Sequence, residues 1–158
     1  MIIGVLGANG EGKSSFIVDF INAHDLKGKY YYLSLLDKPL NTDVNEWFNG
    51  IINKLIDKHS HTAKDINWLV VDDLDNFNVS SASIFNDLVI MARHYNLNII
   101  YSTRRLAYFT KTLVLNTDYF VVFHILASDL KILNDMVGFE WQEIPPKGSH
   151  KYIIYNQS

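Results

Sequence analysis

The feature that most restricts the fold of this chain is an apolar segment that runs straight into a glycine-rich turn. Residues 2–6 are apolar, and Gly7-Ala-Asn-Gly-Glu-Gly-Lys-Ser14 follows with the spacing G-x-x-x-x-G-K-[ST]. Apolar residues at helical spacing come next, from Phe16 to Ile21. In a strand–loop–helix unit of this kind, backbone N–H groups turn toward phosphate oxygens at a helix N-terminus. The pattern predicts a nucleoside triphosphate site built from Gly7, Ala8, Asn9, Gly10, Glu11, Gly12, Lys13, Ser14 and Ser15.

Two side chains in this loop carry specific chemistry. Lys13 is expected to reach the β- and γ-phosphates, and the Ser14 hydroxyl is expected to ligate Mg²⁺. The loop therefore predicts that a nucleoside triphosphate, ATP or GTP, binds together with Mg²⁺. The alternative interpretation is a glycine-rich turn that holds no ligand.

Length and composition limit the remaining possibilities. The 158 residues suit a single domain over 1–158, with 48% hydrophobic and 20% charged residues. The chain has no Cys, which excludes disulfides and thiol nucleophiles. No apolar run approaches a membrane span, and neither a leader nor a membrane segment is expected. The net charge of −3 argues against a broad basic surface for nucleic acid, so such contacts are expected to be local or built by several subunits.

Strand and helix patterns alternate along the chain, which predicts a three-layer α/β/α fold with a mainly parallel central sheet. A helix is expected from Lys13, another after the cap cluster at 41–43, a third from near Ser80 and a last one over 128–138. Two apolar segments near the C-terminus are joined through Pro145 and Pro146, which predicts a closing β-hairpin. The expected strands are 2–6, 30–36, 68–71, 98–102 and 119–125, with hairpin arms at 139–144 and 152–155.

Two acidic residues follow the apolar segment 68–71. Asp72 is expected to hold Mg²⁺ through water, because Mg²⁺ usually keeps several of its waters. Asp73 is the best-placed general base, although hydrolysing enzymes more often have Glu at this point. The alternative is that Asp72, Asp73 and Asp75 only cap a turn.

Polar and basic residues follow the expected strand at 98–102. In P-loop proteins with an additional strand between the loop strand and the carboxylate strand, a polar residue at the end of that additional strand senses the γ-phosphate. Ser102 and Thr103 are the candidates for this sensor, and Thr103 is preferred. Arg104 or Arg105 is expected to neutralise charge in phosphoryl transfer, because the chain has only three arginines and Arg93 lies on a predicted helix. The alternative is a pair of solvated arginines at a strand end.

The second half of the chain resembles the FtsK–HerA superfamily of ATPases, which contains DNA translocases and viral genome-packaging ATPases. The resemblance lies in Ser102-Thr-Arg-Arg105, in Asn116-Thr-Asp-Tyr-Phe-Val-Val-Phe-His124 and in Ser128-Asp-Leu-Lys131. Members of the superfamily place T-[QR]-R-P after the sensor strand, then N-x-[DT] before an apolar strand, then a helix that opens with an acidic residue. Asp37-Lys-Pro39 is a rearranged form of their D-P-K.

The resemblance implies a P-loop NTPase fold of the additional-strand, RecA-like type and an ATPase that works as a ring. Double-stranded DNA would pass through the ring and be contacted through its phosphates. Residues 38–45 and 106–117 are then candidate pore or interface loops, although the aromatic residues of the second segment fit a buried short helix equally well. Lys131 lies about where an inter-subunit arginine often occurs, so the charge supplied in trans is assigned to Lys131, Arg104 or Arg105.

The compact chain favours a small viral packaging ATPase in the infected cell or virion, with a capsid or portal protein as a further partner. An assembly ATPase of the filamentous-phage type is the first alternative, disfavoured by the lack of a membrane segment. A nucleotide-gated adaptor with little hydrolysis is the second, suggested by Asp in place of Glu at position 73. A small nucleotide kinase is the third, disfavoured because three arginines are too few for a lid and an acceptor site.

Overall fold

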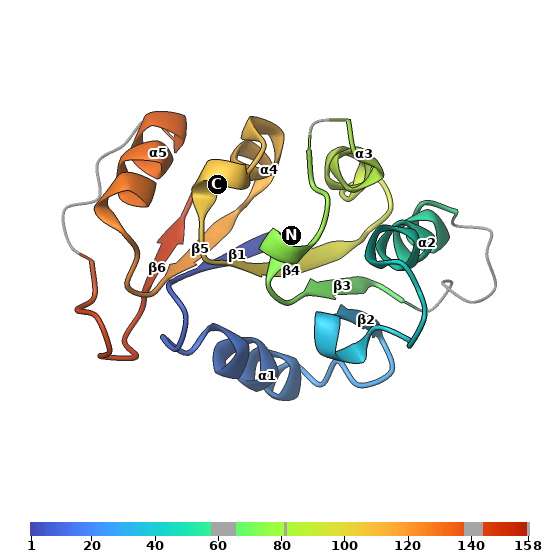
Figure 1. Ribbon diagram of the computed structural model, residues 1–158, viewed down its shortest axis with the longest axis horizontal. Coiled ribbons are helices and arrows are strands. Elements are labelled where there is room, and N and C mark those ends of the chain that lie inside the picture. The colour runs from blue at the N-terminus through green and yellow to red at the C-terminus, as the bar shows by residue number, and fades with distance from the viewer. Residues whose placement is uncertain (58–65, 81, 138–143, 158) are drawn as a thin grey trace.

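The computed structural model describes residues 1–57, 66–80, 82–137 and 144–157. Within them, six strands form one sheet in the order β2-β3-β4-β1-β5-β6 (Figure 1). Neighbouring strands are parallel except at the β5–β6 pair, which is antiparallel. The strands are β1 (Ile2–Leu6), β2 (Tyr30–Leu33), β3 (Trp68–Val71), β4 (Asn98–Thr103), β5 (Tyr119–Val122) and β6 (Ile153–Asn156).

The position of β4 confirms the additional-strand arrangement. β4 lies between β1 and β3, with Leu6 opposite Thr103 and Val71 opposite Tyr101. The carboxyl ends of these three parallel strands therefore share one edge of the sheet. The glycine loop, the acidic turn and the polar end of β4 all follow directly from this edge.

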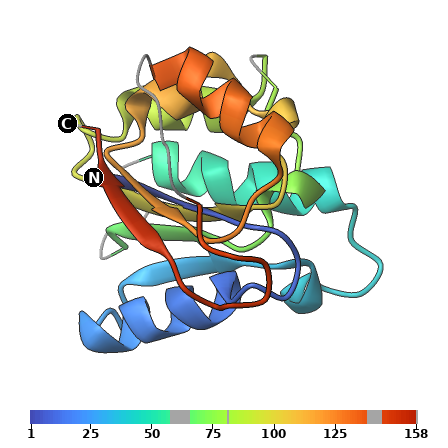
Figure 2. The ribbon, with the colours of Figure 1, turned by 90° about the vertical axis from the view of Figure 1, so that its left-hand side faces the viewer.

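Helices cover both faces of the sheet unequally. The helix α1 (Lys13–Ala23) covers one face, and α2 (Val44–Ile56), α3 (Ile84–Met91), α4 (Lys111–Asn116) and α5 (Ala127–Val137) cover the other (Figure 2). Three short 3-10 helices also occur, namely η1 (Leu35–Asp37), η2 (Leu74–Asn76) and η3 (Leu106–Tyr108). The predicted three-layer α/β/α fold is confirmed.

The central strands are buried on both faces, as their continuous apolar sequences predict. Gly4 in β1 has a packing role, because an added Cβ would lie 2.5 Å from the Tyr101 hydroxyl oxygen of β4. The Tyr101 ring is fully buried, and its hydroxyl is hydrogen-bonded to Thr117 Oγ1 at 2.7 Å. Burial raises the pKa of the Tyr101 hydroxyl, which stays protonated in the core.

Element boundaries follow the sequence closely where a local signal exists. β1 and β3 have the expected bounds, α1 begins at Lys13, and the Asp43 carboxylate caps α2 by accepting from Glu46 N at 3.0 Å. The second strand ends early because Ser34 Oγ accepts from Leu36 N and starts η1. α5 begins at Ala127, so Ser128 lies within the helix and not at its cap.

The predicted C-terminal hairpin falls only partly within the described residues. Residues 139–143 of its first arm lie outside them, and Ile144 is not in a strand. The second arm forms β6, which pairs with β5, with Tyr155 opposite Phe120 and Ile153 opposite Val122. The second arm adds an antiparallel edge to the main sheet.

The segment 106–117 is ordered as η3 and α4 rather than as a free loop. Leu106, Phe109, Leu113 and Val114 are all buried in the larger core. The interpretation as a buried short helix is therefore confirmed for these side chains.

The segment 38–45 has a different character. Lys38 Nζ donates to the Thr42 carbonyl at 2.6 Å and holds the turn together, while Leu40 is 91% exposed.

Among the described residues, no helix is long and apolar enough to cross a membrane.

Candidate nucleotide site

The glycine loop begins between the ends of β4 and β5. Gly7 N donates to the Thr103 carbonyl at 3.1 Å, and Ala8 N donates to the His124 carbonyl at 2.9 Å. Gly12 then adopts a φ of 109° at the N-cap of α1, a conformation that favours glycine. The loop is thus fixed at both ends, and α1 starts directly behind it.

Lys13 lies inside this loop. It is only 8% exposed, and its Nζ donates to the Ala8 carbonyl at 3.0 Å. Burial lowers the pKa of the Lys13 ammonium, while the carboxylates of Asp73 and Asp72 act in the opposite direction. The cation is therefore held against the loop backbone, where the phosphates of a bound nucleotide would lie.

The two predicted magnesium ligands are neighbours in space, although 58 positions separate them in sequence. Ser14 Oγ donates to the Asp72 carboxylate and lies 2.9 Å from Oδ2 and 3.2 Å from Oδ1. Asp72 also accepts from Ser102 Oγ at 2.8 Å and from Tyr32 OH at 3.2 Å. A hydroxyl and a carboxylate at one point fit Mg²⁺, which typically takes one or two protein ligands together with phosphates and waters.

Tyr32 was not identified from the sequence. Burial raises the pKa of its hydroxyl, and the neighbouring Asp72 carboxylate adds to that rise. The neutral hydroxyl consequently serves as a donor that orients Asp72. The only sequence signal was its position two residues after the start of β2.

Asp73 lies at the turn between β3 and η2 in a left-handed conformation with φ 60°. Its backbone N donates to Ser102 Oγ at 2.7 Å, and its Oδ1 lies 3.5 Å from Arg104 Nε. Burial raises the pKa of the Asp73 carboxyl, and the Arg104 guanidinium opposes part of that rise. A raised pKa suits a carboxylate that accepts a proton.

Asp75 connects the acidic turn to the end of β4. Its side chain is 6% exposed and accepts from Thr103 Oγ1, from Arg104 N at 2.9 Å and from Arg104 Nε at 3.3 Å. Thr103, the preferred sensor, is itself buried and bonded to this carboxylate. From the sequence Asp75 was only a possible turn cap, because nothing local shows that it faces β4.

The side chain of Arg105 contacts α5, although its backbone N donates to Thr103 Oγ1 at 3.2 Å. Arg105 Nε is 3.4 Å from Asp129 Oδ2 on α5, and that carboxylate is almost completely buried. Lys131 is exposed on the same helix. The structure therefore places Arg104 beside Asp73 and gives Arg105 a contact with α5.

A cavity of about 590 Å³ lies over the loop, and the predicted residues that line it come from two segments, the loop and the acidic turn after β3. Glu11 is different from its neighbours, because its buried carboxylate accepts from Gly148 N at 2.9 and 3.1 Å. It anchors the C-terminal segment to the loop, a role without a local sequence signal. The predicted lining residues are Asn9, Gly10, Gly12, Lys13, Ser14, Ser15, Asp72 and Asp73, and the sequence did not indicate Ser34, Leu35, Leu36, Asn76 or His150.

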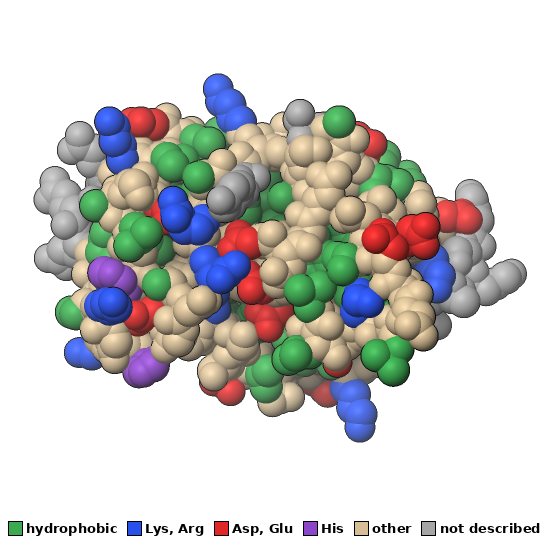
Figure 3. Space-filling view, in the orientation of Figure 1, with side chains coloured by type: hydrophobic (Ala, Val, Ile, Leu, Met, Phe, Trp, Pro, Cys, Tyr) green, Lys and Arg blue, Asp and Glu red, His purple; other side chains and the backbone are tan. Residues whose placement is uncertain are grey.

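Charge is mixed on the face drawn in Figure 3. Among the described residues on this face, basic side chains are scattered, and acidic side chains lie beside basic ones near the centre. The described residues form no broad basic patch on this face, the kind of surface that binds duplex DNA.

Comparison with solved structures identifies proteins of the same fold. The genome-packaging NTPase B204 of Sulfolobus turreted icosahedral virus 2, in complex with sulfate, matches with a TM-score of 0.65 and 15% identity over 85% of this chain and 80% of that one. ATPases 2 and 3 of EssC from Geobacillus thermodenitrificans match with a TM-score of 0.66 and 16% identity, over 98% of this chain and 37% of that one. The N-terminal domain of zonular occludens toxin from Neisseria meningitidis matches with a TM-score of 0.51 and 14% identity, over 76% and 74%.

No protein-family model and no curated protein sequence matches the chain. The structural similarity therefore establishes the fold, and the local geometry of the site carries the functional argument.

Proposed function

We propose that this protein is a Mg²⁺-dependent ATPase of the FtsK–HerA type that translocates double-stranded DNA, most simply to package a viral genome. The observation that carries the ATPase proposal is the contact between Ser14 Oγ and Asp72 Oδ2 at 2.9 Å, at the start of α1. It brings the two expected metal ligands together beside the buried cation of Lys13.

Binding would replace contacts that the chain makes with itself. The N–H groups of the loop and the Lys13 ammonium would hold the phosphates, and Lys13 would exchange the Ala8 carbonyl for phosphate oxygens. Ser14 and Asp72 would hold Mg²⁺, which supplies charge neutralisation at the β- and γ-phosphates. Tyr32 and Ser102 would keep the Asp72 carboxylate oriented.

In hydrolysis, a water oxygen attacks the γ-phosphorus and the bond to the β–γ bridging oxygen breaks, giving ADP and phosphate. Asp73 would accept the proton of the attacking water, and its raised pKa favours that transfer. Arg104 is 3.5 Å from Asp73 and can turn toward the γ-phosphate to neutralise developing charge. Thr103 would report the state of the γ-phosphate through Asp75.

The motor function is supported by the motif resemblance and by the shared fold with the B204 packaging NTPase. A ring of several chains would supply the DNA contacts that the mixed surface charge of one chain does not, and Lys131 on α5 remains a candidate for charge supplied in trans. A capsid or portal protein would be the further partner, in an infected cell or a virion.

The test is ATP hydrolysis measured with and without duplex DNA, on protein whose native mass is determined in the same buffer. We expect weak basal activity that rises with DNA, and no activity in Lys13→Ala. Lys54→Ala on α2 is the matched control, because it removes an exposed lysine far from the loop in sequence. An ATP hydrolysis rate that does not change with duplex DNA in an assembled sample would exclude translocation. An unchanged hydrolysis rate in Lys13→Ala would exclude this site as the site of hydrolysis.

A second candidate is a nucleotide-gated adaptor with little hydrolysis. It is favoured by the ion pair between Arg104 and Asp73, which occupies the expected base. Asp73→Ala and Asp73→Glu separate the two functions. Loss of activity in the first and a gain in the second support the ATPase, whereas equal, negligible rates in all forms support the adaptor.

A further inference from the structure

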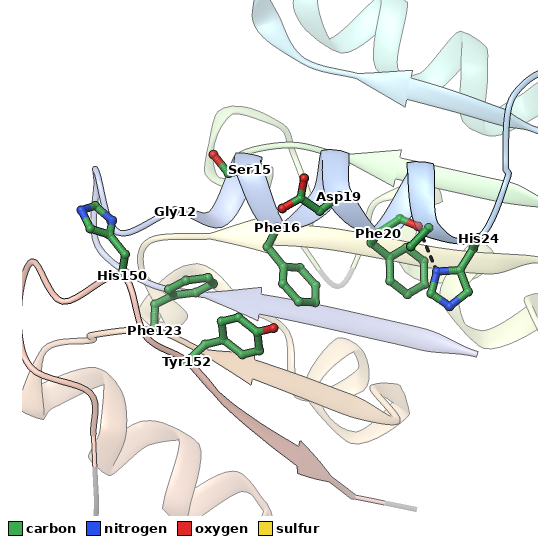
Figure 4. Close-up of a pocket in the computed structure, with 10 residues that line it drawn as sticks. Gly12, Ser15, Phe16, Asp19, Phe20, His24, Phe123, His150 and Tyr152 are labelled. Carbon is green, nitrogen blue, oxygen red and sulfur yellow. Dashed lines mark hydrogen bonds between the residues drawn. The ribbon is translucent and has the colours of Figure 1, made fainter.

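A second cavity, of about 490 Å³, lies beside the phosphate cavity along α1. Its walls are mostly rings, and the aromatic groove is defined here by Phe16, Phe20, Phe123, His150 and Tyr152. In Figure 4, Phe16 and Phe20 point from α1 toward the strands, and His150 lies next to Gly12. None of these residues takes part in the phosphate and metal chemistry described above.

The rings form a shaped surface. Phe16 and Tyr152 meet edge to face with centroids 5.2 Å apart, and Phe123 lies 5.2 Å from Tyr152. Phe123 is buried and forms the floor, while Tyr152 is 46% exposed and offers ring surface to the cavity. Such rings bind flat aromatic ligands by stacking.

The aromatic groove and the phosphate cavity are continuous. Gly12, Ser15 and His150 line both of them. The segment that carries His150 and Tyr152 is fixed to the loop by the two contacts between Glu11 and Gly148 N, and His124 Nδ1 is 3.0 Å from the Pro145 carbonyl. These contacts fix the position of the aromatic groove relative to the glycine loop.

We propose that the aromatic groove receives the purine base of the nucleoside triphosphate whose phosphates occupy the glycine loop, with Tyr152 as the stacking surface. This inference rests on the proposed function, because it needs the phosphates in that loop. A ligand with a polar, anionic end and a flat, apolar end matches one polar cavity joined to one aromatic cavity. Purines bind more tightly than pyrimidines here, because their ring area is larger.

The test compares ATP with tripolyphosphate, which lacks the base and sugar, by calorimetry with Mg²⁺. Tyr152→Ala lowers the affinity for ATP about fivefold to 150-fold, the usual range for loss of one stacked base, and leaves the affinity for tripolyphosphate unchanged. Tyr152→Phe keeps the ring and restores ATP affinity. Ile153→Ala is the control, because Ile153 is the next residue, is also exposed and does not line the aromatic groove.

Each outcome has a separate meaning. ATP affinity that depends on Lys13 but not on Tyr152 overturns the base site and leaves the proposed function intact. An equal loss for ATP and tripolyphosphate in Tyr152→Ala, or a change in native mass alone, also overturns it. Failure of the unaltered protein to bind either ligand overturns the proposed function and the base site together.

Discussion

Asp75 gives the sharpest test of how the site is organised. Its carboxylate accepts three hydrogen bonds, from Thr103 Oγ1, Arg104 N and Arg104 Nε, and its side chain is 6% exposed. Asp75→Asn has the same shape, and its amide oxygen can still accept from Arg104 N while its NH2 group donates to Thr103 Oγ1, but it loses the charge that holds the Arg104 side chain. Asp75→Ala removes both acceptor oxygens and with them all three hydrogen bonds.

The expected magnitudes follow from these contacts. Hydrogen bonds to charged groups contribute about 1.5–3 kcal/mol each, and the Arg104 contact belongs at or below the low end because that side chain is 38% exposed. We expect Asp75→Ala to lose about 3–5 kcal/mol of unfolding free energy and Asp75→Asn about 1–2 kcal/mol. At about 2–4 °C per kcal/mol, Asp75→Asn lowers the Tm by about 2–8 °C and remains folded.

The catalytic consequence of Asp75→Asn is expected in kcat. Neither Thr103 nor Arg104 lines the phosphate cavity, so the Kd for ATP should stay within about threefold of its original value. A loosely held Arg104 should lower kcat about tenfold, equivalent to about 1.4 kcal/mol in the barrier.

Steady-state hydrolysis at saturating ATP measures kcat, calorimetry measures Kd, and a thermal scan measures Tm. Asp135→Asn is the control, because Asp135 is an exposed acid on α5. An unchanged kcat in a folded Asp75→Asn protein, or a parallel loss of kcat and ATP affinity, would refute the positioning role of Asp75.

Three further outcomes are expected. The pKa of Asp73 is raised in the folded state, so ionisation of this carboxyl lowers the free energy of unfolding at pH values above its ordinary pKa of 3.8. Asp73→Asn should therefore raise the Tm at pH 7. In thermal scans, the pH-dependent part of that gain should vanish below about pH 4. Gly4→Ala should cost about 1–3 kcal/mol by overpacking against Tyr101, and denaturant unfolding of the double variant with Tyr101→Phe should recover part of that cost. Arg105→Ala should destabilise the fold by leaving the Asp129 carboxylate buried without its partner, and Asp129→Asn should relieve the loss; a drop in kcat without any change in Tm would instead indicate a catalytic Arg105.

The sequence predicted the parts of the fold that depend on neighbours along the chain. β1, β3 and the start of α1 follow from apolar runs and from the glycine spacing, and these elements have the expected bounds. The Asp43 cap of α2 is a similarly local signal. The shared edge of the sheet then explains why Ser14 and Asp72 meet, since parallel strands end on the same side.

The parts that the sequence did not predict depend on contacts between distant segments. Apolar residues after a Pro-Pro turn do not specify a partner strand, and only the register of β6 on β5 shows that this segment extends the main sheet. Glu11 was predicted to bind the nucleotide from its place in the loop, and no local pattern indicated that its carboxylate accepts from Gly148 N, 137 positions later.

Several polar groups of this site contact one another. Lys13 bonds to the Ala8 carbonyl, Ser14 bonds to Asp72, and Arg104 lies between Asp73 and Asp75. Each contact keeps a partly buried charge or hydroxyl from being left without a partner, which would otherwise destabilise the fold.

Under the proposed function, a bound nucleotide with Mg²⁺ would exchange these contacts for its own, so its net affinity would be the difference between the two sets. The exchange would free the Asp73 carboxylate only when Arg104 moves, and Arg104 is bonded through Asp75 to the end of β4. Occupation of the γ-phosphate position and release of the proposed base would then be linked through the same arginine, which would give a physical reason for hydrolysis to wait until the site is complete.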